Sequence, residues 1–228
     1  MAGASPIVRR LGGNQEIQRP PAFRVRPDNP WHKNDTSALA SLQQVADKVA
    51  RFSKSVVHPP TPDGMVLSAV LVALFEGASG TEVVLTRRSM QLTNHKGQIS
   101  FPGGRVDARE DVVGAAIREA HEEIDLHPND VEVLGQLGAF STYVSDSYII
   151  PVVARLKAPP SLAAQNYEVD RVFSVPLIEL VRHDTYSEEY WGTPDNEHRL
   201  HFFYLDDETV WGATGHMLFQ LLSAAVAR

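Results

Sequence analysis

Three glutamates close together in the chain, Glu119, Glu122 and Glu123, constrain the fold more than any other feature. The apolar residues around them recur with helical spacing, which predicts a helix over residues 110–124. At spacings of three and four residues the glutamates share one helix face, where like charges repel each other. The other side of the helix is apolar and can pack inward, through Val112, Val113, Ala116, Ala120 and Ile124. We therefore expect a helix anchored on a core, with an acidic face turned outward.

This acidic face has two interpretations. Most glutamate-rich helix faces are simply solvated, whereas a bound divalent cation would remove the repulsion between the carboxylates. Carboxylate oxygens select hard ions such as Mg²⁺ or Mn²⁺. The Gly103-Gly104 pair before the helix lets backbone groups approach a ligand closely, and this favours the cation.

Strands and helices alternate irregularly in the rest of the chain, so we expect an α/β or α+β fold with a mixed sheet. Strands are predicted over residues 65–75, 82–87, 98–101, 131–140, 148–156 and 198–205. Residues 102–104 are predicted as a loop, residues 176–183 as a short helix and residues 214–227 as a terminal helix.

The first 60 residues differ from the rest in composition. Residues 1–35 are rich in Pro, Arg, Asn and Gly and lack periodicity, so this arm is either disordered or extended over a partner surface. A helix follows over residues 36–53, capped by Asp35 or Thr36. Its apolar stripe consists of Leu39, Leu42, Val45, Val49 and Phe52. The stripe docks either on the core of its own chain or on a second subunit, which would give a homodimer.

Charge and composition exclude several classes of function. A net charge of −7 argues against general nucleic-acid binding, which needs a basic surface. The absence of cysteine excludes disulfides, thiolate metal sites and a Cys nucleophile. The longest apolar runs, residues 66–75 and 218–227, are about half as long as a membrane-spanning helix, and no signal-peptide pattern precedes them. We therefore expect a cytoplasmic protein without a membrane or nucleic-acid partner.

A longer pattern contains the predicted helix. It runs from Gly104 through Glu110 and Arg118-Glu119-Ala120 to Glu122-Glu123. The pattern resembles the Nudix box of the Nudix hydrolases, and every charged position matches. Asp125 stands where the box has its last glycine, at a position expected to be left-handed, which Asp tolerates. The resemblance implies an α/β/α sandwich with a mixed sheet over residues 61–228, preceded by the arm and helix of residues 1–60.

The resemblance also implies the roles of the box residues and the reaction. The ligands of Mg²⁺ or Mn²⁺ would be the carboxylates of Glu119, Glu122 and Glu123 and the carbonyl of Gly104. Glu119 would in addition act as a base or orient the attacking water. Arg118 would orient the carboxylates through a bidentate pair, supported by Glu110. The implied activity is hydrolysis of a P–O–P link by metal-activated water.

The residues before the box indicate a substrate. Leu85-Thr86-Arg87-Arg88-Ser89 and Gly97–Gly104 resemble the signature of the coenzyme A diphosphatase branch of the Nudix hydrolases, with Thr93 in place of its middle arginine. This branch would hydrolyse coenzyme A or acyl-CoA to phosphopantetheine and adenosine 3′,5′-bisphosphate. The substrate-binding candidates are Arg87, Arg88, Lys96, Phe101 and Glu168. Phe101 and Tyr143 either border the substrate or belong to the core, and Glu168 is either a base or a surface charge.

Two alternatives remain open. Because of Thr93, the substrate could instead be another nucleoside diphosphate derivative: ADP-ribose, a dinucleotide or a damaged nucleotide. The second alternative is a binding or regulatory module with weak catalysis. The complete set of mutually repelling charges argues against this module, because a retired site has no physical reason to keep them.

Overall fold

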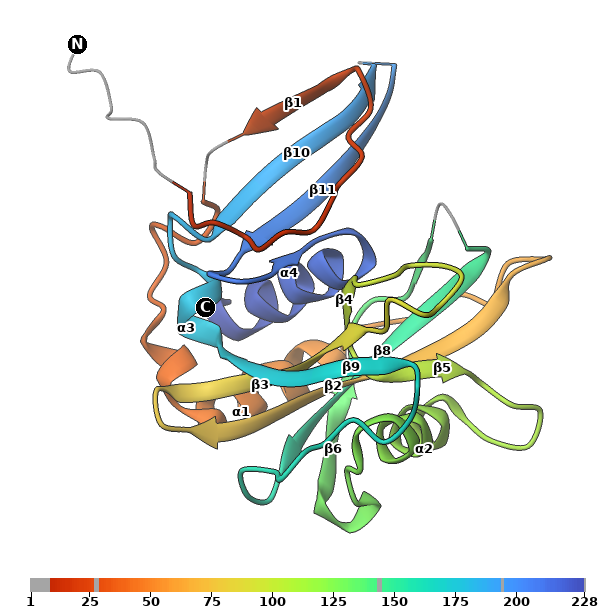
Figure 1. The fold of residues 1–228 in the computed structure, drawn as a ribbon. Helices are drawn as coiled ribbons and strands as arrows, with labels where there is room; N and C mark the ends of the chain where they lie inside the picture. The colour runs from red at the N-terminus through yellow and green to blue at the C-terminus, as the bar shows by residue number, and fades with distance from the viewer. Residues whose placement is uncertain (1–8, 27–28, 143–144, 194, 228) are drawn as a thin grey trace.

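The computed structural model describes residues 9–26, 29–142, 145–193 and 195–227, and its centre is a mixed sheet (Figure 1). Within these ranges the main strand order is β4-β3-β2-β8-β6, while β5 also pairs with β2, β7 with β8 and β9 with β3. The central pair β2·β8 is parallel and the pairs around it are antiparallel. The strands are β2 (Val66–Gly77), β3 (Gly80–Arg88), β4 (Ile99–Ser100), β5 (Gly103–Arg105), β6 (Val131–Gln136), β7 (Phe140–Ser141), β8 (Ser147–Leu156) and β9 (Val169–Pro176).

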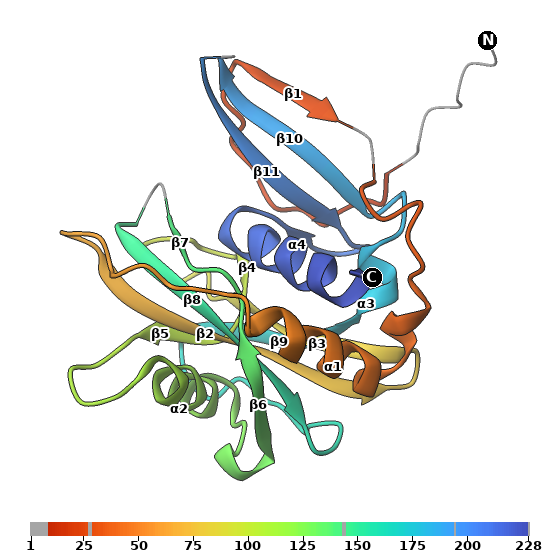
Figure 2. The same cartoon turned by 180° about the vertical axis from the view of Figure 1, so that it is seen from behind.

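Helices cover both faces of this sheet (Figure 2). The predicted acidic helix, α2 (Val112–Ile124), lies on one face, and α1 (Leu42–Ser53) and α4 (Gly212–Val226) lie on the other. Alternation along β2 supplies both cores: Ala69, Leu71 and Ala73 pack in the cluster with α2, and Val70, Val72 and Leu74 pack in the cluster with α1 and α4. The predicted α/β/α sandwich with a mixed sheet is confirmed.

A second, antiparallel sheet lies over α4 (Figure 1). Its strands, in spatial order within the described ranges, are β1 (Phe23–Arg26), β10 (Tyr186–Thr193), β11 (Asn196–Tyr204) and β12 (Thr209–Val210). Aromatic rings fill the space between sheet and helix, and Tyr186 stacks edge-on against both Trp31 and Phe203. The short elements are the helix α3 (Leu177–Leu180) and the 3₁₀ turns η1 (Ser37–Ala40) and η2 (Pro128–Asp130). In the described ranges, none of the helices combines the length and apolar character needed to cross a membrane.

The N-terminal arm lies against its own chain. In its described part, residues 9–26 run extended across the second sheet and end in β1, which pairs with β10. Of the two predicted alternatives, an extended conformation is correct for these residues, but the surface beneath them belongs to the same molecule and not to a partner.

The helix predicted over residues 36–53 is wrong at its start. Residues 37–40 form η1, and Ser41 then leaves helical geometry and caps α1 by accepting a hydrogen bond from the Gln44 N–H. The apolar stripe docks on the core, as one alternative predicted, and Leu39, Val45 and Val49 are fully buried there. Leu42 of the stripe is half-buried and Phe52 stays 36% exposed, and the homodimer stays a prediction.

Three further predictions need correction. The loop at residues 102–104 is wrong, because Gly103–Arg105 pairs with β2 as β5. The helix predicted from residue 110 begins at Val112, since Asp111 caps it by accepting from the Gly114 N–H. The strand over residues 131–140 is divided into β6 and β7, with a register shift at Gly135. Strand β10 was not predicted at all.

The main core includes residues on both sides of residue 60. Trp31, Leu39 and Val49 belong to the same buried cluster as Val72 of β2 and Leu218 of α4. The domain boundary at residue 60 stays a prediction. The stability of α1 and that of the sheet therefore depend on the same apolar contacts.

Replacement of Leu39 tests this shared core. Leu39 is 0% exposed, so Leu39→Ala should lower the free energy of unfolding by about 2–5 kcal/mol through lost burial and a residual cavity. Urea unfolding of the full chain measures the loss. The control is Val57→Ala, since Val57 is 86% exposed and its replacement should cost less than about 0.5 kcal/mol. Equal effects of both substitutions would contradict the packing of this segment on the core.

Candidate active site

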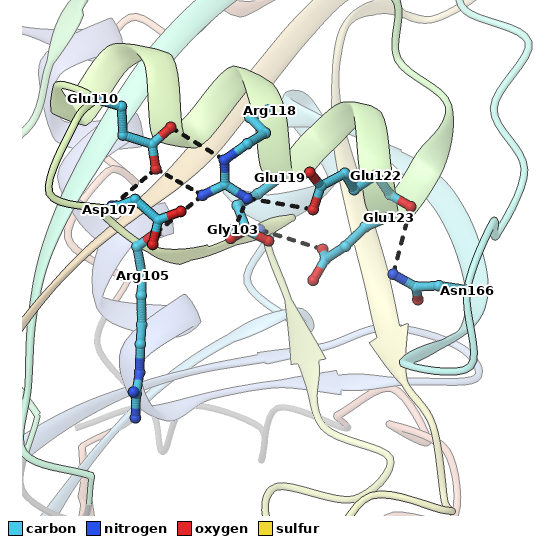
Figure 3. A network of polar contacts seen from close by, with 9 residues as sticks. All are labelled: Gly103, Arg105, Asp107, Glu110, Arg118, Glu119, Glu122, Glu123 and Asn166. Atoms are coloured by element: carbon cyan, nitrogen blue, oxygen red, sulfur yellow. Dashed lines mark hydrogen bonds and ion pairs between the residues drawn. The ribbon is translucent and has the colours of Figure 1, made fainter.

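Arg118 is the centre of a network of carboxylates on α2 (Figure 3). Its Nε and Nη2 donate to the two oxygens of Glu110 at 3.1 and 2.8 Å, a bidentate pair. Its Nη1 donates to Glu119 at 2.9 Å and to Glu122 at 3.3 Å. These bonds, that to Glu110 first, raise the pKa of Arg118, and the same contact lowers the pKa of Glu110. The arginine therefore partly compensates the repulsion that the sequence predicted.

Glu110 reaches this network from outside the helix. It lies before the Asp111 cap, and its carboxylate also accepts from the Asp107 N–H at 2.9 Å. Arg118 Nη2 in turn donates to the Arg105 carbonyl at 3.2 Å, which ties the helix to the end of β5. The connection between β5 and α2 is thus held by hydrogen bonds at both ends (Figure 3).

The glycines of β5 let the carboxylates of α2 lie directly against the strand. A Cβ atom added to Gly104 would lie 2.4 Å from Glu119 Oε1, far inside van der Waals contact. The Gly103 N–H donates to Glu123 Oε2 at 3.3 Å. At this glycine pair the backbone lies close to the side chains of Glu119 and Glu123, and its close approach to a ligand stays a prediction.

Glu123 is a charged group in an unfavourable place. It is 5% exposed, and burial raises its pKa to about 8. The negative charges of Glu119 and Glu168 raise this pKa further, while the Gly103 N–H and the positive charge of Arg88 lower it. Burial also raises the pKa of Glu119, against the effect of Arg118. An additional positive charge at this point would stabilise the ionised carboxylates.

The chemistry of this site fits a hard divalent cation. Its donors are carboxylate oxygens, and the buried Glu123 has a single hydrogen bond from Gly103 among the described contacts. Among the described residues, no three His, Asp or Glu side chains lie close enough together to coordinate a metal ion as they stand. Glu119 and Glu122 turn toward Arg118 instead, and Glu123 turns toward Gly103 (Figure 3).

The two predicted substrate arginines have different neighbours. A register shift separates Arg87 from Arg88 in β3. Arg87 Nη1 donates to the buried Glu208 at 3.1 Å, while Arg88 lies within the charge field of Glu123. The Nε atoms of both arginines are buried and have no hydrogen-bond partner in the described part of the chain, so the charge field of Glu123 is what distinguishes Arg88. Arg88 is therefore the arginine at the carboxylate site.

The remaining candidates are spread over the fold. Phe101 is 2% exposed and belongs to the main core, so its prediction as a substrate contact is replaced by a packing role. Lys96 is exposed in the loop between β3 and β4, as is Thr93. Glu168 lies in the charge field of both Glu119 and Glu123. Tyr143 lies outside the described residues.

Sequence reasoning missed two contributors to the site. The first is the Gly103 N–H, although the glycine pair itself had been singled out. The second is the hydrogen bond from the Ser89 N–H to the Glu168 carbonyl at 2.7 Å, which brings the end of β3 to the Glu168 loop. The spacing of residues within one segment cannot predict a contact between segments so far apart in the chain.

Asp125 confirms one expectation about the end of α2. It adopts the left-handed conformation, with φ of 59° and ψ of 28°, and its N–H closes the last helical turn. Asp thus replaces glycine here without changing the geometry of the helix end.

Comparison with known proteins gives matches of three kinds: a family model, relatives in sequence and solved structures. A family model described as the NUDIX domain matches residues 65–196. An uncharacterized Nudix hydrolase, NudL, of Photorhabdus laumondii is 33% identical over 181 residues, covering 78% of this chain and 95% of that protein. A NudL of Pectobacterium atrosepticum, also uncharacterized, is 34% identical over 155 residues, covering 68% and 80%. A crystal structure of a C. elegans Ap4A hydrolase binary complex aligns with a TM-score of 0.43 and 22% identity, covering 53% of this chain and 86% of that one.

Gly104→Ala tests the contact between β5 and Glu119. The added methyl group would overlap the carboxylate, so turnover should fall at least about tenfold, while the variant stays folded. Steady-state kinetics and thermal unfolding measure the two effects. The matched control is Gly114→Ala in α2, where the nearest atom to the new Cβ is 3.3 Å away and turnover should stay within about twofold. Full activity of Gly104→Ala would show that this contact is dispensable.

Burial of Glu123 leads to a prediction about how thermal stability depends on pH. Its pKa is raised to about 8 from the ordinary value of 4.5, so the folded protein binds this proton more tightly than the unfolded chain. The stabilisation is complete below about pH 4.5 and is lost as the pH rises to about 8. Without metal, Glu123→Gln should therefore melt above the parent at pH 8, with a weaker pH dependence between pH 5 and 8.

Thermal unfolding in the presence of EDTA measures this difference. The control is Glu132→Gln, because Glu132 forms an exposed pair with Arg155 away from the site. If both variants shift alike with pH, burial of Glu123 is not the cause.

Proposed function

Because the chain belongs to the NUDIX domain family and is a hydrolase of pyrophosphate bonds, we propose that it cleaves the diphosphate bond of coenzyme A or acyl-CoA. Its action on a nucleoside diphosphate derivative follows from the family; coenzyme A is the finer proposal. The products would be phosphopantetheine, acylated for acyl-CoA, and adenosine 3′,5′-bisphosphate. The observation that carries the proposal is the buried carboxyl group of Glu123 within the charge field of Arg88.

The proposed ligands of Mg²⁺ or Mn²⁺ are the carboxylates of Glu119, Glu122 and Glu123 and the carbonyl of Gly104. The raised pKa values of Glu119 and Glu123 support this set, since burial disfavours the ionised form of both carboxyl groups and a cation would favour it. When bound, such an ion supplies water of lowered pKa and neutralises charge on the phosphate oxygens.

Arg118 and Glu110 would act as one unit in this site. The bidentate pair fixes the guanidinium, and the fixed guanidinium holds Glu119 and Glu122 on the same side of α2. Glu110 is thus proposed to position Arg118, and Arg118 to position the carboxylates.

Two residues are candidates for the base that accepts the proton of the attacking water. Glu119 is one, as the family resemblance implies. Glu168 is the other. Its charge interaction with both Glu119 and Glu123 supports a position at the site and argues against a remote surface charge.

Arg88 is proposed to bind the diphosphate of the substrate. A guanidinium binds phosphate oxygens through paired N–H groups, and Arg88 is the arginine of this pair that lies in the charge field of Glu123. Arg87 is already paired with Glu208 and is not expected to contribute. The signature of residues 85–104 supports coenzyme A, and Thr93 within it is the position that separates coenzyme A from other diphosphates.

Comparison of five substrates tests the proposal: coenzyme A, acetyl-CoA, ADP-ribose, NADH and 8-oxo-dGTP, each with Mg²⁺ and with Mn²⁺. We expect kcat/KM for coenzyme A or acetyl-CoA to exceed the others at least about tenfold, measured by chromatography of the released adenosine 3′,5′-bisphosphate and the corresponding nucleotides. A preference for another diphosphate would reject coenzyme A and keep the family activity. Absence of turnover with every compound would favour the binding-module alternative.

The neighbouring arginines give a matched control for the same assay. Arg88→Ala should raise KM about tenfold or more, because a charge-assisted contact with phosphate is lost. Arg87→Ala removes the same side chain one residue away and should leave KM within about threefold. Equal effects would contradict the assignment of Arg88 to the diphosphate.

A further inference from the structure

Ion pairs of Arg10 and Arg19 fix the N-terminal arm to α3, to the turn between β11 and β12 and to β10. Arg10 donates to Asp206 at 2.7 and 2.8 Å and to Glu179 at 2.8 Å. Arg19 donates from Nε and Nη2 to Glu189, whose side chain is 2% exposed. A buried carboxylate depends strongly on its partner, so Arg19 is a firm attachment of the arm.

Between these ion pairs the arm makes a turn that requires glycine. Gly12 and Gly13 have φ of 73° and 71°, in the left-handed region. Thr209 Oγ1 donates to the Gly12 carbonyl at 2.6 Å, and a Cβ atom on Gly12 would lie 2.4 Å from that same hydroxyl. On Gly13 it would lie 2.0 Å from the Asp207 carbonyl oxygen. The arm is therefore in direct backbone contact with the turn that leads into β12.

Gln15 connects this turn to the loop between β3 and β4. Its Oε1 accepts from the Thr209 N–H, and its Nε2 donates to the Gly97 carbonyl at 3.3 Å. Gly97 donates its N–H to the Arg88 carbonyl at 3.0 Å, and the Arg88 N–H donates to Gln98 at 2.9 Å. A continuous series of hydrogen bonds thus runs from the arm to the backbone of Arg88.

The other side of the same loop is attached to the site. The Ser89 N–H donates to the Glu168 carbonyl at 2.7 Å, and the Met90 N–H donates to Asp170 at 3.2 Å. Residues 89–98 are therefore held between the Glu168 segment on one side and Gln15 on the other. Because Arg88 is the last residue of β3, the conformation of this loop fixes the position of the Arg88 backbone.

We propose that the arm is a strap that holds the loop of residues 89–98, and that Gln15 is a positioning residue for Arg88. Residues 9–19 supply the attachment, and the amide of Gln15 transmits it to Gly97. The consequence for substrate affinity rests on the proposed role of Arg88. The attachment of the loop does not, because it follows from the hydrogen bonds alone.

Gln15→Glu separates the two halves of this bridge. The new carboxylate keeps an acceptor for the Thr209 N–H but places an oxygen opposite the Gly97 carbonyl, where no hydrogen bond can form. We expect faster amide hydrogen exchange in peptides covering residues 88–98, a KM raised about threefold or more and a kcat within about twofold. Gln15→Ala loses both bonds and should show the same pattern more strongly.

The control is Arg24→Ala, which lies in the same arm, in β1, and breaks an exposed ion pair with Glu197 of β11. This variant should change neither the hydrogen exchange of residues 88–98 nor KM. Unchanged exchange in Gln15→Glu would overturn the strap. Faster exchange with an unchanged KM, for a substrate that the parent cleaves, would overturn the positioning of Arg88. If the parent cleaves no diphosphate, the proposed function fails, and hydrogen exchange alone still decides whether the arm holds the loop.

Discussion

The close packing of α2 on β2 sets the geometry of the candidate site. The two elements meet through small side chains, and the fully buried alanines at this contact are Ala69, Ala73, Ala115, Ala116 and Ala120. Small residues let the helix approach the sheet closely, and the interior there excludes water. Glu123 loses its solvent for this reason. The strand beside β2 needs glycine at Gly104, because the same approach presses Glu119 against it.

Features that depend on local periodicity were predictable. The face shared by Glu119, Glu122 and Glu123 and the apolar side of α2 follow from spacing along one helix, whereas the left-handed Asp125 was expected from the resemblance to the Nudix box. The strands β2 and β8 were predictable for a similar reason: buried strands are continuous apolar runs. The strand pattern predicted only an α/β or α+β fold with a mixed sheet, and the sandwich was implied by the resemblance to the Nudix hydrolases.

Features that depend on distant contacts were not predictable. A register shift at Arg87 and Arg88 cannot be recognised in an isolated strand, so the two arginines looked equivalent. Strand β10 escaped because Glu188 and Glu189 interrupt its apolar pattern, although both are buried and paired with arginines. The arm was predicted to be either disordered or extended over a partner surface, because the carboxylates that stabilise it, Glu179 and Glu189, lie about 170 residues later in the sequence. Its arginines gave no local sign of these partners.

The attachment of the arm to β10 and β12 has a consequence for the order in which the molecule is assembled. Residues 9–19 are synthesised well before their partners, because Arg19 and Glu189 are 170 residues apart and Gln15 and Thr209 are 194 residues apart. Contacts of such long sequence separation form late, after the local elements have folded. The arm can therefore dock only after β10 and β12 have been synthesised and have folded.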